Sequence, residues 1–503
     1  MQIISMCRKF YLYGKESRLQ GSLIKRTKGK MKKILVTTLV LLSGYYVSAQ
    51  HQEISEKPEM YKGKQVQTVD STSILSAFKR GHFNGHFRYF FMATDNASGL
   101  TDYFANAAGG GIRFETAAFH RFQFVVSGFY TFNIGSSDLS KADTLTGQFN
   151  RYETALFDVN DPANKKNIDR LEEFYLKYHF KNTSISFGRQ LLNTPFINLQ
   201  DGRMRPTGVE GVWVEFDKPQ KVKISGGLLY AVSPRGTTKW YSIGNSLGVY
   251  PAGINTDGTR SQYSNNINSD AIALLGVQLK TGKNITLTGW DVYTGNVFNT
   301  AMIQADLSFA KKNNSSFFAA AQYIKQDAVK NGGNTDATKA YFEKGGRSLS
   351  FGFKAGWKNR SWEASLNYNR ITKHGRYLMP REWGRDPFFT FLPRERNEGF
   401  GNVHAILGKV NYNIIKAGVK ISLAAGYYSM PDVKDHRLNK YGLPSYSQVN
   451  TDIRYIFSGL LKGLDAQLLV VWKKNEGELY NNKRFEFNKV NMMQYNLVLN
   501  FHF

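Results

Sequence analysis

The sequence has 503 residues and is strongly basic, with 66 Lys and Arg against 39 Asp and Glu and a formal net charge of +27. Basic chains often bind nucleic acid, but this one has no basic tract and begins with what resembles an export signal, so we expect no nucleic-acid partner. Beyond that signal no apolar run is long enough to cross a bilayer as a helix, which excludes a helical membrane protein.

Residues 1–49 are predicted to be a leader. From Met31 to Ala49 the chain has two lysines, an apolar run and the small-residue pattern Val47-Ser48-Ala49, which together are typical of a secretory signal peptide. The apolar run, about 14 residues, is too short for a membrane-spanning helix. We therefore expect cleavage after Ala49, with Met31 as the true start and residues 1–30 as a mis-assigned extension.

The leader contains the only cysteine, Cys7, so the exported chain is expected to have neither disulfide bonds nor thiol chemistry. The exported chain stays basic, because the leader holds only ten Lys and Arg and one Glu, and a net charge of +18 remains. Residues 50–80 follow as a polar N-terminal segment on the periplasmic side.

Residues 81–503 show a hydrophobic period of two. In the C-terminal segment VNMMQYNLVLNFHF, aromatic and aliphatic residues alternate with Asn and His up to Phe503, and LEEFYLKYHF and LSFGFKAGW alternate in the same way. This is the period of a β-strand with one apolar and one polar face.

Eighteen such runs follow one another, and their connections sort by length. The eight short ones are AFHR, FKNT, DKPQK, KTGKN, AKKNNS, KNRS, IIKAG and SGLLKG; the other nine range from about seven residues to nearly forty. With a periplasmic N-terminus every short connection is periplasmic, as in outer-membrane barrels. We therefore predict an all-β fold, a transmembrane antiparallel β-barrel of 18 strands with long extracellular loops.

The segment GRQLLNTPFINLQDGRMRPTGVEG, residues 188–211, joins the fifth and sixth runs as the third long loop. Its apolar residues are hard to explain on a solvated tip, so we expect the loop to fold inward. Its charged residues would then line a constriction; they are Arg189, Asp201, Arg203, Arg205 and Glu210. Strict alternation places Arg189 on the lipid side, and only a strand end at Gly188 or a bulge would turn it inward.

This loop resembles the OprD family of outer-membrane porins, also called outer-membrane carboxylate channels. The family's pattern of Gly-Arg, Thr-Pro, Asp-x-Arg-Met-x-Pro and Gly-Val is matched in order and spacing by Gly188-Arg189, Thr194-Pro195, Asp201–Pro206 and Gly211-Val212. The resemblance implies an eighteen-stranded barrel whose third and seventh outer loops form the constriction, and a ladder of lumen arginines and lysines that guides carboxylate-bearing solutes. The long loops rich in Gly and Asn depart from the family, so substrate choice does not carry over.

The seventh long loop contains HGRYLMPREWGRDPFFTFLPRERNEG, residues 374–399, and again combines arginines with aromatic residues. By analogy with the family it would form the second half of the constriction through Arg381, Arg385, Arg394 and Arg396. The alternative is a solvated loop whose arginines pair with its own acidic residues.

Alternation along the strands also places basic residues on the face opposite to the apolar one, which points into the lumen. The predicted basic ladder comprises Arg88, Arg113, Lys177, Lys354, Lys358, Lys409, Lys420 and Arg454, and Arg121 and Lys473 share its parity. Acidic residues such as Glu173 and Asp452 lie on the same face, so the lumen is not of one sign. A basic pore with low-dielectric walls raises the local concentration of anions, and the planar fork of arginine suits a carboxylate.

We therefore predict a substrate-selective porin of the bacterial outer membrane that lets small anionic or zwitterionic solutes diffuse passively. Its surroundings would be outer-membrane lipid and lipopolysaccharide, and its state monomeric or trimeric. No catalytic residue, metal or cofactor is expected: His82 and His86 share a face without a third ligand, and the common zinc, phosphate and nucleophile motifs are missing.

Three alternatives stay open. One is a barrel enzyme that acts as a protease or lipase. Another is a structural barrel with no open pore. The third is an energised transporter, which the short stretch before the first strand disfavours because it leaves no room for a plug domain.

Overall fold

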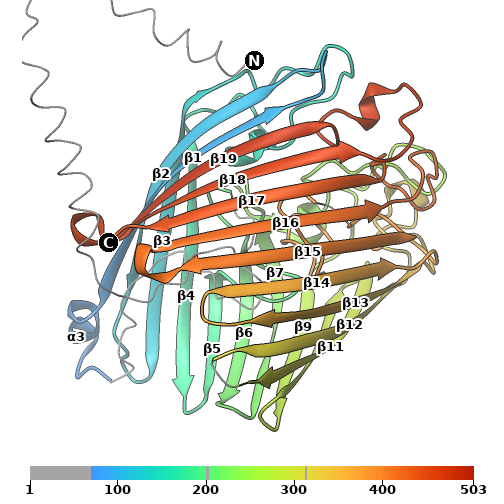
Figure 1. Ribbon diagram of the computed structural model, residues 1–503. Coiled ribbons are helices and arrows are strands. Elements are labelled where there is room, and N and C mark those ends of the chain that lie inside the picture. Colours follow the sequence, from blue (N-terminus) through green and yellow to red (C-terminus); the bar gives the residue numbers. More distant parts are fainter. Residues whose placement is uncertain (1–69, 200–202, 312–313, 396) are drawn as a thin grey trace, which may run out of the picture. The chain divides into compact units, whose positions relative to one another are not determined.

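The computed structural model describes residues 70–199, 203–311, 314–395 and 397–503. Everything discussed below lies within the unit Val47–Phe503. The predicted leader, and the part of the 50–80 segment before residue 70, are therefore not described. The described chain forms a closed antiparallel barrel of 18 strands (Figure 1).

The barrel strands follow in chain order. They are β1 (His82–Asp95), β2 (Tyr103–Glu115), β3 (Phe122–Ser136), β4 (Ile168–Phe180), β5 (Thr183–Gln190), β6 (Gly208–Lys218), β7 (Val222–Ser233), β9 (Ile272–Thr281), β10 (Ile285–Thr294), β11 (Phe298–Ala310), β12 (Ser316–Ala328), β13 (Arg347–Lys358), β14 (Trp362–Ile371), β15 (Val403–Ile414), β16 (Val419–Ser429), β17 (Tyr446–Ile456), β18 (Leu464–Asn475) and β19 (Met492–His502).

Short elements lie before β1 and in the connections between strands. They are the helices α3 (Ile74–Lys79) and α4 (Ile243–Ser246), the two-residue strand β8 (Tyr241–Ser242), and the 3-10 turns η1 (Thr154–Leu156), η2 (Ala337–Lys339), η3 (Ile415–Ala417), η4 (Gly459–Leu461) and η5 (Lys483–Phe485). No helix in the described part of the chain is both long and apolar enough to cross a membrane.

The first and last strands close the sheet. β1 pairs antiparallel with β19 from His86↔His502 to Asp95↔Met493, and β1 also pairs with β2. Because the hydrocarbon core of a bilayer offers no partners for backbone N–H and C=O groups, a sheet can cross it only when its edges meet in this way.

The predicted strand order is confirmed, with one exception in the loops. All eight short connections are found where the sequence placed them, including Lys181-Asn182 between β4 and β5. The connection between β10 and β11, expected to be long, contains only residues 295–297. Asn296 adopts a positive φ of 63° and the N–H of Val297 donates to the carbonyl of Thr294, so a Gly-Asn tight turn replaces the loop.

The two faces of the wall differ in polarity as the period of two predicts. On β1 the side chains of Phe83 and Phe87 are exposed on the outer face, whereas His86 and Met92 are buried inside. The same outward exposure of large apolar residues recurs on strand after strand, for example at Ile303. Exposed aromatic and aliphatic side chains of this kind form the lipid-facing band of an outer-membrane barrel.

Residues 70–81 dock against the end of the barrel with the short turns. The N–H of Ser71 donates to the carbonyl of Ala118, and the N–H of Ala117 donates to that of Ala77 at the end of α3. Phe78 of α3 stacks on Phe114 of β2 with ring centroids 5.9 Å apart. This part of the N-terminal segment is thus fixed to the β2–β3 turn.

Neighbouring strands approach some glycines closely, so we expect two strand glycines to differ in how well they tolerate a side chain. A methyl group at Gly227 of β7 would overlap the carbonyl oxygen of Val212, whereas at Gly289 of β10 it would lie 4.0 Å from the carbonyl oxygen of Met302. We expect Gly227→Ala to destabilise the barrel by about 1–3 kcal/mol, because a neighbouring strand must shift. Gly289→Ala serves as the control. The temperature at which the folded electrophoretic band is lost would measure both, and equal losses would contradict the register.

Candidate functional site: the loop-filled barrel interior

The third long loop, L3 (residues 191–207), folds into the barrel as predicted. Its apolar side chains leave water almost completely: Phe196 and Ile197 are 0% and 1% exposed, and Leu192, Leu199 and Met204 are also buried. The hydroxyl of Thr194 accepts from the N–H of Ile197 and donates to its carbonyl, which holds the loop in a compact turn.

The seventh long loop, L7 (residues 372–402), packs against L3. The N–H of Asn198 donates to the carbonyl of Trp383 at 3.1 Å, and its side-chain oxygen accepts from the N–H of Arg385 at 3.1 Å. The hydroxyl of Thr207 donates to the carbonyl of Glu382 at 2.8 Å. The two loops expected to form a constriction therefore meet inside the barrel.

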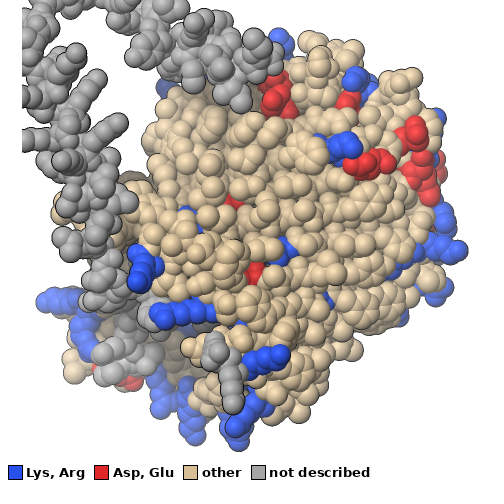
Figure 2. All heavy atoms as spheres, in the orientation of Figure 1, with Lys and Arg blue, Asp and Glu red and all other residues tan. Residues whose placement is uncertain are grey.

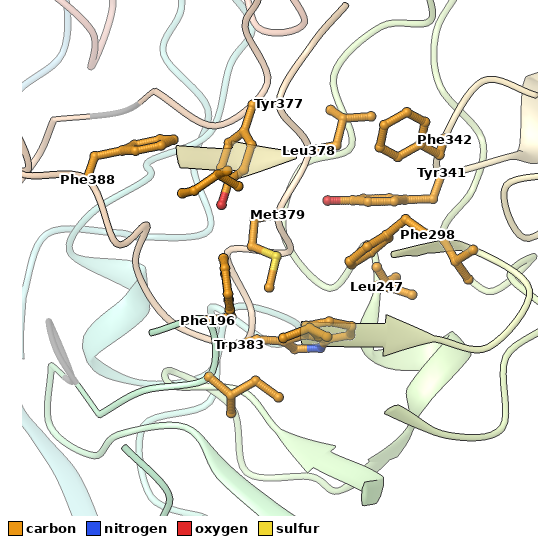
Figure 3. Packing of buried hydrophobic residues seen from close by; sticks show 14 of the residues in the cluster. Phe196, Leu247, Phe298, Tyr341, Phe342, Tyr377, Leu378, Met379, Trp383 and Phe388 are labelled. Carbon is orange, nitrogen blue, oxygen red and sulfur yellow. The ribbon is translucent and has the colours of Figure 1, made fainter. Parts of the chain in front are cut away.

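One apolar cluster joins these loops to the wall (Figure 3). Trp383 and Tyr377 of L7 lie in it with Phe196 of L3, Phe298 of β11 and Tyr341 from the β12–β13 loop. The ring of Trp383 lies 6.0 Å from that of Phe298, and its indole N–H donates to the hydroxyl of Ser246. Each fully buried large side chain contributes about 1.5–3 kcal/mol, so the loops form a second core inside the barrel.

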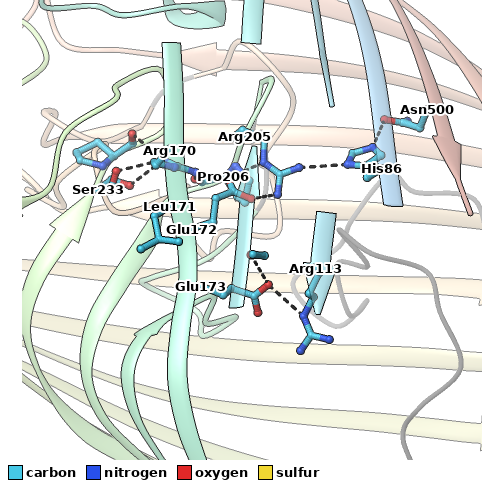
Figure 4. A network of polar contacts seen from close by, with 12 residues as sticks. His86, Arg113, Arg170, Leu171, Glu172, Glu173, Arg205, Pro206, Ser233 and Asn500 are labelled. Atoms are coloured by element: carbon cyan, nitrogen blue, oxygen red, sulfur yellow. Dashed lines mark hydrogen bonds and ion pairs between the residues drawn. The ribbon is translucent and has the colours of Figure 1, made fainter. Parts of the chain in front are cut away.

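A buried ion network fastens L3 to the wall (Figure 4). Arg205 donates to both carboxylate oxygens of Glu172, with its Nε 2.5 Å from Oε1, and Nη2 of Arg170 lies 2.9 Å from the same oxygen. Nη1 of Arg205 lies 3.1 Å from Nδ1 of His86, whose Nε2 lies 3.1 Å from Oδ1 of Asn500. One arginine of L3 thus connects to β4 and β1, and through His86 to β19.

Glu172 is a residue that the sequence analysis missed. The pairing of β3 with β4 jumps from Ser127↔Glu173 to Gly128↔Leu171, which leaves Glu172 as the extra residue of a β-bulge. The bulge turns both Glu172 and Glu173 toward the interior, where both are buried. Strict alternation had given only one of them that direction.

The arginines of L7 reach different parts of the wall. Nη2 of Arg394 donates to the side-chain oxygen of Asn496 on β19 at 2.7 Å, and its Nε donates to Gln494. Arg381 lies 3.5 Å from a carboxylate oxygen of Glu398 and donates to the carbonyl of Pro251 at 2.6 Å. Arg385 lies over the ring of Phe391, also in L7, at 4.4 Å.

The alternative of a solvated L7 is wrong, although part of its pairing exists. Arg381 does pair with an acidic residue of its own loop, as that alternative expected, but the loop is packed inside the barrel rather than in water. Arg203 of L3 is likewise buried and has a positive φ of 51°. Asp201 and Arg396 lie outside the described residues.

Two of the predicted constriction residues lie on the other side of the wall. In the strand register Arg189 lies opposite Phe174 of β4, and the side chain of Phe174 is exposed on the outer face. The Nε of Arg189 donates to Glu210 at 3.0 Å. The guanidinium lies 4.7 Å from the ring of Trp240, and Tyr230, also outward, donates to Glu210. Placing Arg189 and Glu210 in the constriction was wrong, because no bulge interrupts β5 before Gln190 and strict alternation holds.

The predicted basic ladder lies on the inner face, mostly in the half of the barrel nearer the short turns. Arg454 makes a two-fold contact with Asp452, both distances being 2.9 Å, and Arg113 donates to Glu115 and Glu173 at 2.5 and 3.1 Å. The amines of Lys354 and Lys358 lie 5.3 and 5.9 Å from the ring centre of Phe318.

The remaining ladder positions agree in direction with the prediction. In the strand registers Arg88 lies opposite Asn500, Lys177 opposite Gln123, Lys409 opposite Ser365, and Lys420 opposite Arg454. Lys473 also points inward, and its amine donates to the carbonyl of Arg394 in L7. Arg121 does not: it is exposed in the β2–β3 turn with a positive φ of 68°.

A buried lysine, Lys440, lies where the outer loops meet. Its amine is 3.4 Å from the hydroxyl of Tyr263 and 4.8 Å from the ring centre of Tyr341. Burial lowers the pKa of Lys440 to about 7, against the opposing effect of Glu398. No local sequence pattern indicates Lys440, because its partners come from three other loops.

Known proteins resemble this chain both in sequence and in fold. A family model described as outer membrane porin, OprD family, matches residues 139–379. OccK3 (OpdO) of Pseudomonas aeruginosa superposes with a TM-score of 0.62 at 12% identity, covering 85% of this chain and 97% of that one. OpdK of the same organism, solved with vanillate, gives 0.65 at 12% identity over 85% and 99%.

A third structure, OccAB4 of Acinetobacter baumannii, gives a TM-score of 0.64 at 14% identity over 84% of this chain and 98% of that one. At such identities the structural likeness concerns the fold alone. A search of curated protein sequences finds no match.

The closed barrel and the matched family define the class of protein, an outer-membrane channel for small solutes. The family model that matches is the one that the L3 motif indicated: the resemblance to the OprD family of outer-membrane porins is confirmed, and it extends from residue 139 to residue 379, well beyond the loop that first showed it. This family consists of porins rather than enzymes.

The ion network predicts that Glu172→Gln destabilises L3. The substitution leaves two buried guanidinium groups facing a neutral amide, and breaking a buried pair typically costs about 3–5 kcal/mol. Glu215→Gln is a matched control, because Glu215 is 41% exposed and lies 3.7 Å from Lys223, and such a pair contributes about 0–1 kcal/mol. Protease cleavage within L3 would measure the difference, and equal resistance in both variants would contradict the role of Glu172.

The low pKa of Lys440 predicts a pH dependence of loop packing. Below pH 7 the amine of Lys440 is charged whether the loops are packed or unpacked. Between pH 7 and 10.5, its ordinary pKa, the amine is neutral in the packed loops and takes up a proton when they unpack. The free energy of unpacking therefore rises with pH in that window, by at most about 1.4 kcal/mol per pH unit. Hydrogen-exchange protection of residues 430–445, corrected for the intrinsic rate, should increase from pH 7 to 9 in the native protein and stay flat in Lys440→Met.

Proposed function

We propose that this channel favours small solutes that carry a carboxylate. The observation that carries the proposal is the set of basic side chains on the inner wall toward the periplasmic end. Among the described residues, Lys177, Lys354 and Lys358 of this set form no ion pair with a carboxylate, and the nearest acidic neighbour in the strand register is Glu363 opposite Lys358, so part of their charge stays available to a solute. The similar channel OpdK was solved with vanillate, an aromatic carboxylate, which supports the same class of solute.

The selectivity would arise from electrostatics inside a low-dielectric wall. Two unit charges about 4 Å apart interact by roughly 4 kcal/mol at an effective dielectric constant near 20. Attraction of this size, divided among several positions, biases entry toward anions yet lets each anion leave. Acidic neighbours such as Asp452 and Glu173 keep some of the basic groups ordered and prevent uniform trapping of the solute.

The arginines of L3 and L7 would act mainly by holding the constriction in shape. Arg205 and Arg394 are each 6% exposed. Arg205 forms hydrogen bonds with Glu172 and His86, and Arg394 donates to Gln494 and Asn496. Arg203, Arg381 and Arg385 lie in the same pair of loops, and with the two residues outside the described chain, Asp201 and Arg396, they complete the proposed constriction. Export by the predicted signal peptide and a monomeric or trimeric state belong to the same proposal.

A test compares two solutes of nearly equal size. Liposomes that contain the protein should admit vanillate faster than vanillyl alcohol, by about tenfold, the lower end of rate gains from electrostatic attraction. The double variant Lys354→Glu, Lys358→Glu should reduce that ratio toward one, since it places negative charges on the path of the anion.

The matched control is Lys330→Glu, Lys344→Glu, which makes the same change in net charge on exposed residues of the β12–β13 loop. The control should keep the native ratio. Equal entry of the two solutes through the native protein, or an equal effect of both double variants, would refute carboxylate preference. Entry of neither solute would favour a structural barrel.

A further inference from the structure

The short turns share a charge pattern that the channel function does not use. Between the strand ends, each of the eight turns carries at least one Lys or Arg and no Asp or Glu, although the exposed Asp217 lies at the end of β6 next to its turn. We define the basic turn ring as these exposed residues: Arg121, Lys181, Lys221, Lys283, Lys311, Arg360, Lys416 and Lys462. The ring lies at the end of the barrel that is periplasmic in this class of protein.

The loops at the opposite end of the barrel mix the two signs, with only a small basic excess overall. The loop between β3 and β4, residues 137–167, contains more acidic than basic residues, and L7 also contains both signs. Figure 2 shows the contrast on one face: blue atoms gather along its lower left edge with little red, whereas red and blue are mixed at the upper right. The asymmetry is therefore local and is not simply the net charge of the chain.

Apolar side chains are exposed at the same level as the ring. Leu460 and Leu461 precede Lys462 and are 105% and 51% exposed, and Ile415 precedes Lys416. Helix α3 exposes Ile74 and Leu75, at 61% and 64%. Apolar groups of this size are unfavourable in water, but they are stable at a membrane interface beside basic residues.

Aromatic residues of the lipid-facing wall contact members of the ring. The amine of Lys181 lies 5.5 Å from the ring centre of Phe180, and the guanidinium of Arg121 lies 5.6 Å from it. The amine of Lys311 lies 4.4 Å from the ring centre of Phe317. Both phenylalanines are exposed on the outer wall, so these cations lie at its edge rather than on the axis of the channel.

We propose that the basic turn ring binds the headgroups of anionic phospholipids in the inner leaflet of the outer membrane. The positive charges meet lipid phosphates, and the neighbouring apolar residues enter the acyl region. A soluble anionic polymer would match the charges but would leave Leu460, Leu461, Ile74 and Leu75 in water. The ring would thus fix the depth of the barrel in its membrane, independently of which solute passes.

The test measures which lipids contact the folded protein. The protein is placed in vesicles of phosphatidylcholine and phosphatidylglycerol, and spin-labelled forms of both report their relative association with its surface. Phosphatidylglycerol should associate about fivefold more strongly, the ratio given by roughly 1 kcal/mol per basic residue near a surface. The preference should weaken at high salt.

Two variants of equal charge separate position from net charge. The ring variant combines Lys181→Gln, Lys221→Gln, Lys283→Gln, Lys416→Gln and Lys462→Gln, and it should lose most of the preference while its conductance is unchanged. The control combines Lys141→Gln, Lys165→Gln, Lys330→Gln, Lys344→Gln and Lys373→Gln in the outer loops. The control should keep the preference.

Three results would overturn the proposal: equal association of the two lipids with the native protein, an equal loss of preference in the two variants, or a preference that the ring variant retains. A native protein that ignores phosphatidylglycerol but binds soluble polyglutamate through the same lysines would assign the ring to a soluble anionic partner instead. The electrophoretic mobility of each unheated variant verifies that it is folded.

Discussion

The whole structure depends on the need to satisfy backbone hydrogen bonds where no water is present. Strands that cross a bilayer must pair on both sides, and the β1–β19 register meets this need by closing the sheet. Closure then creates an outside that faces lipid and an inside that faces water and the loops. The two-residue period of a strand decides whether a side chain faces the lipid or the interior. On β1, for example, Phe87 is exposed on the outside and its neighbour His86 is buried inside.

The inside is shaped by a second constraint, which is that buried charges need partners. L3 brings Arg205 into the barrel, and the bulge on β4 supplies Glu172 to meet it. L7 brings Arg394 to the amide groups of β19. Apolar contacts between Phe196 and Trp383 add the hydrophobic contribution that brings the two loops together. The two loops are therefore a packed part of the protein, and in the proposed function the solute would meet the charges of the wall.

The sequence was sufficient for those features that depend on local periodicity. It placed the strands, the short turns and the inward fold of L3, because alternation and the apolar content of residues 188–211 are local signals. It failed where a single residue changes the period: a bulge lies at Glu172 of β4, whereas β5 keeps its alternation through Arg189. It also failed where partners are remote, as for Lys440 and Tyr263, since no local pattern encodes a contact between distant loops. The role of the wall charges stays a prediction.

The central claim, that L3 and L7 meet inside a closed barrel, can be tested by cross-linking. The only cysteine is Cys7, in the predicted leader, so cysteines introduced by Asn198→Cys and Arg385→Cys would be the reactive pair in the exported chain. In outer membranes a short bis-maleimide should link them and change the mobility of the protein, while a large maleimide polymer added from outside should not label position 198. Rapid labelling by the polymer, with no cross-link, would contradict the account.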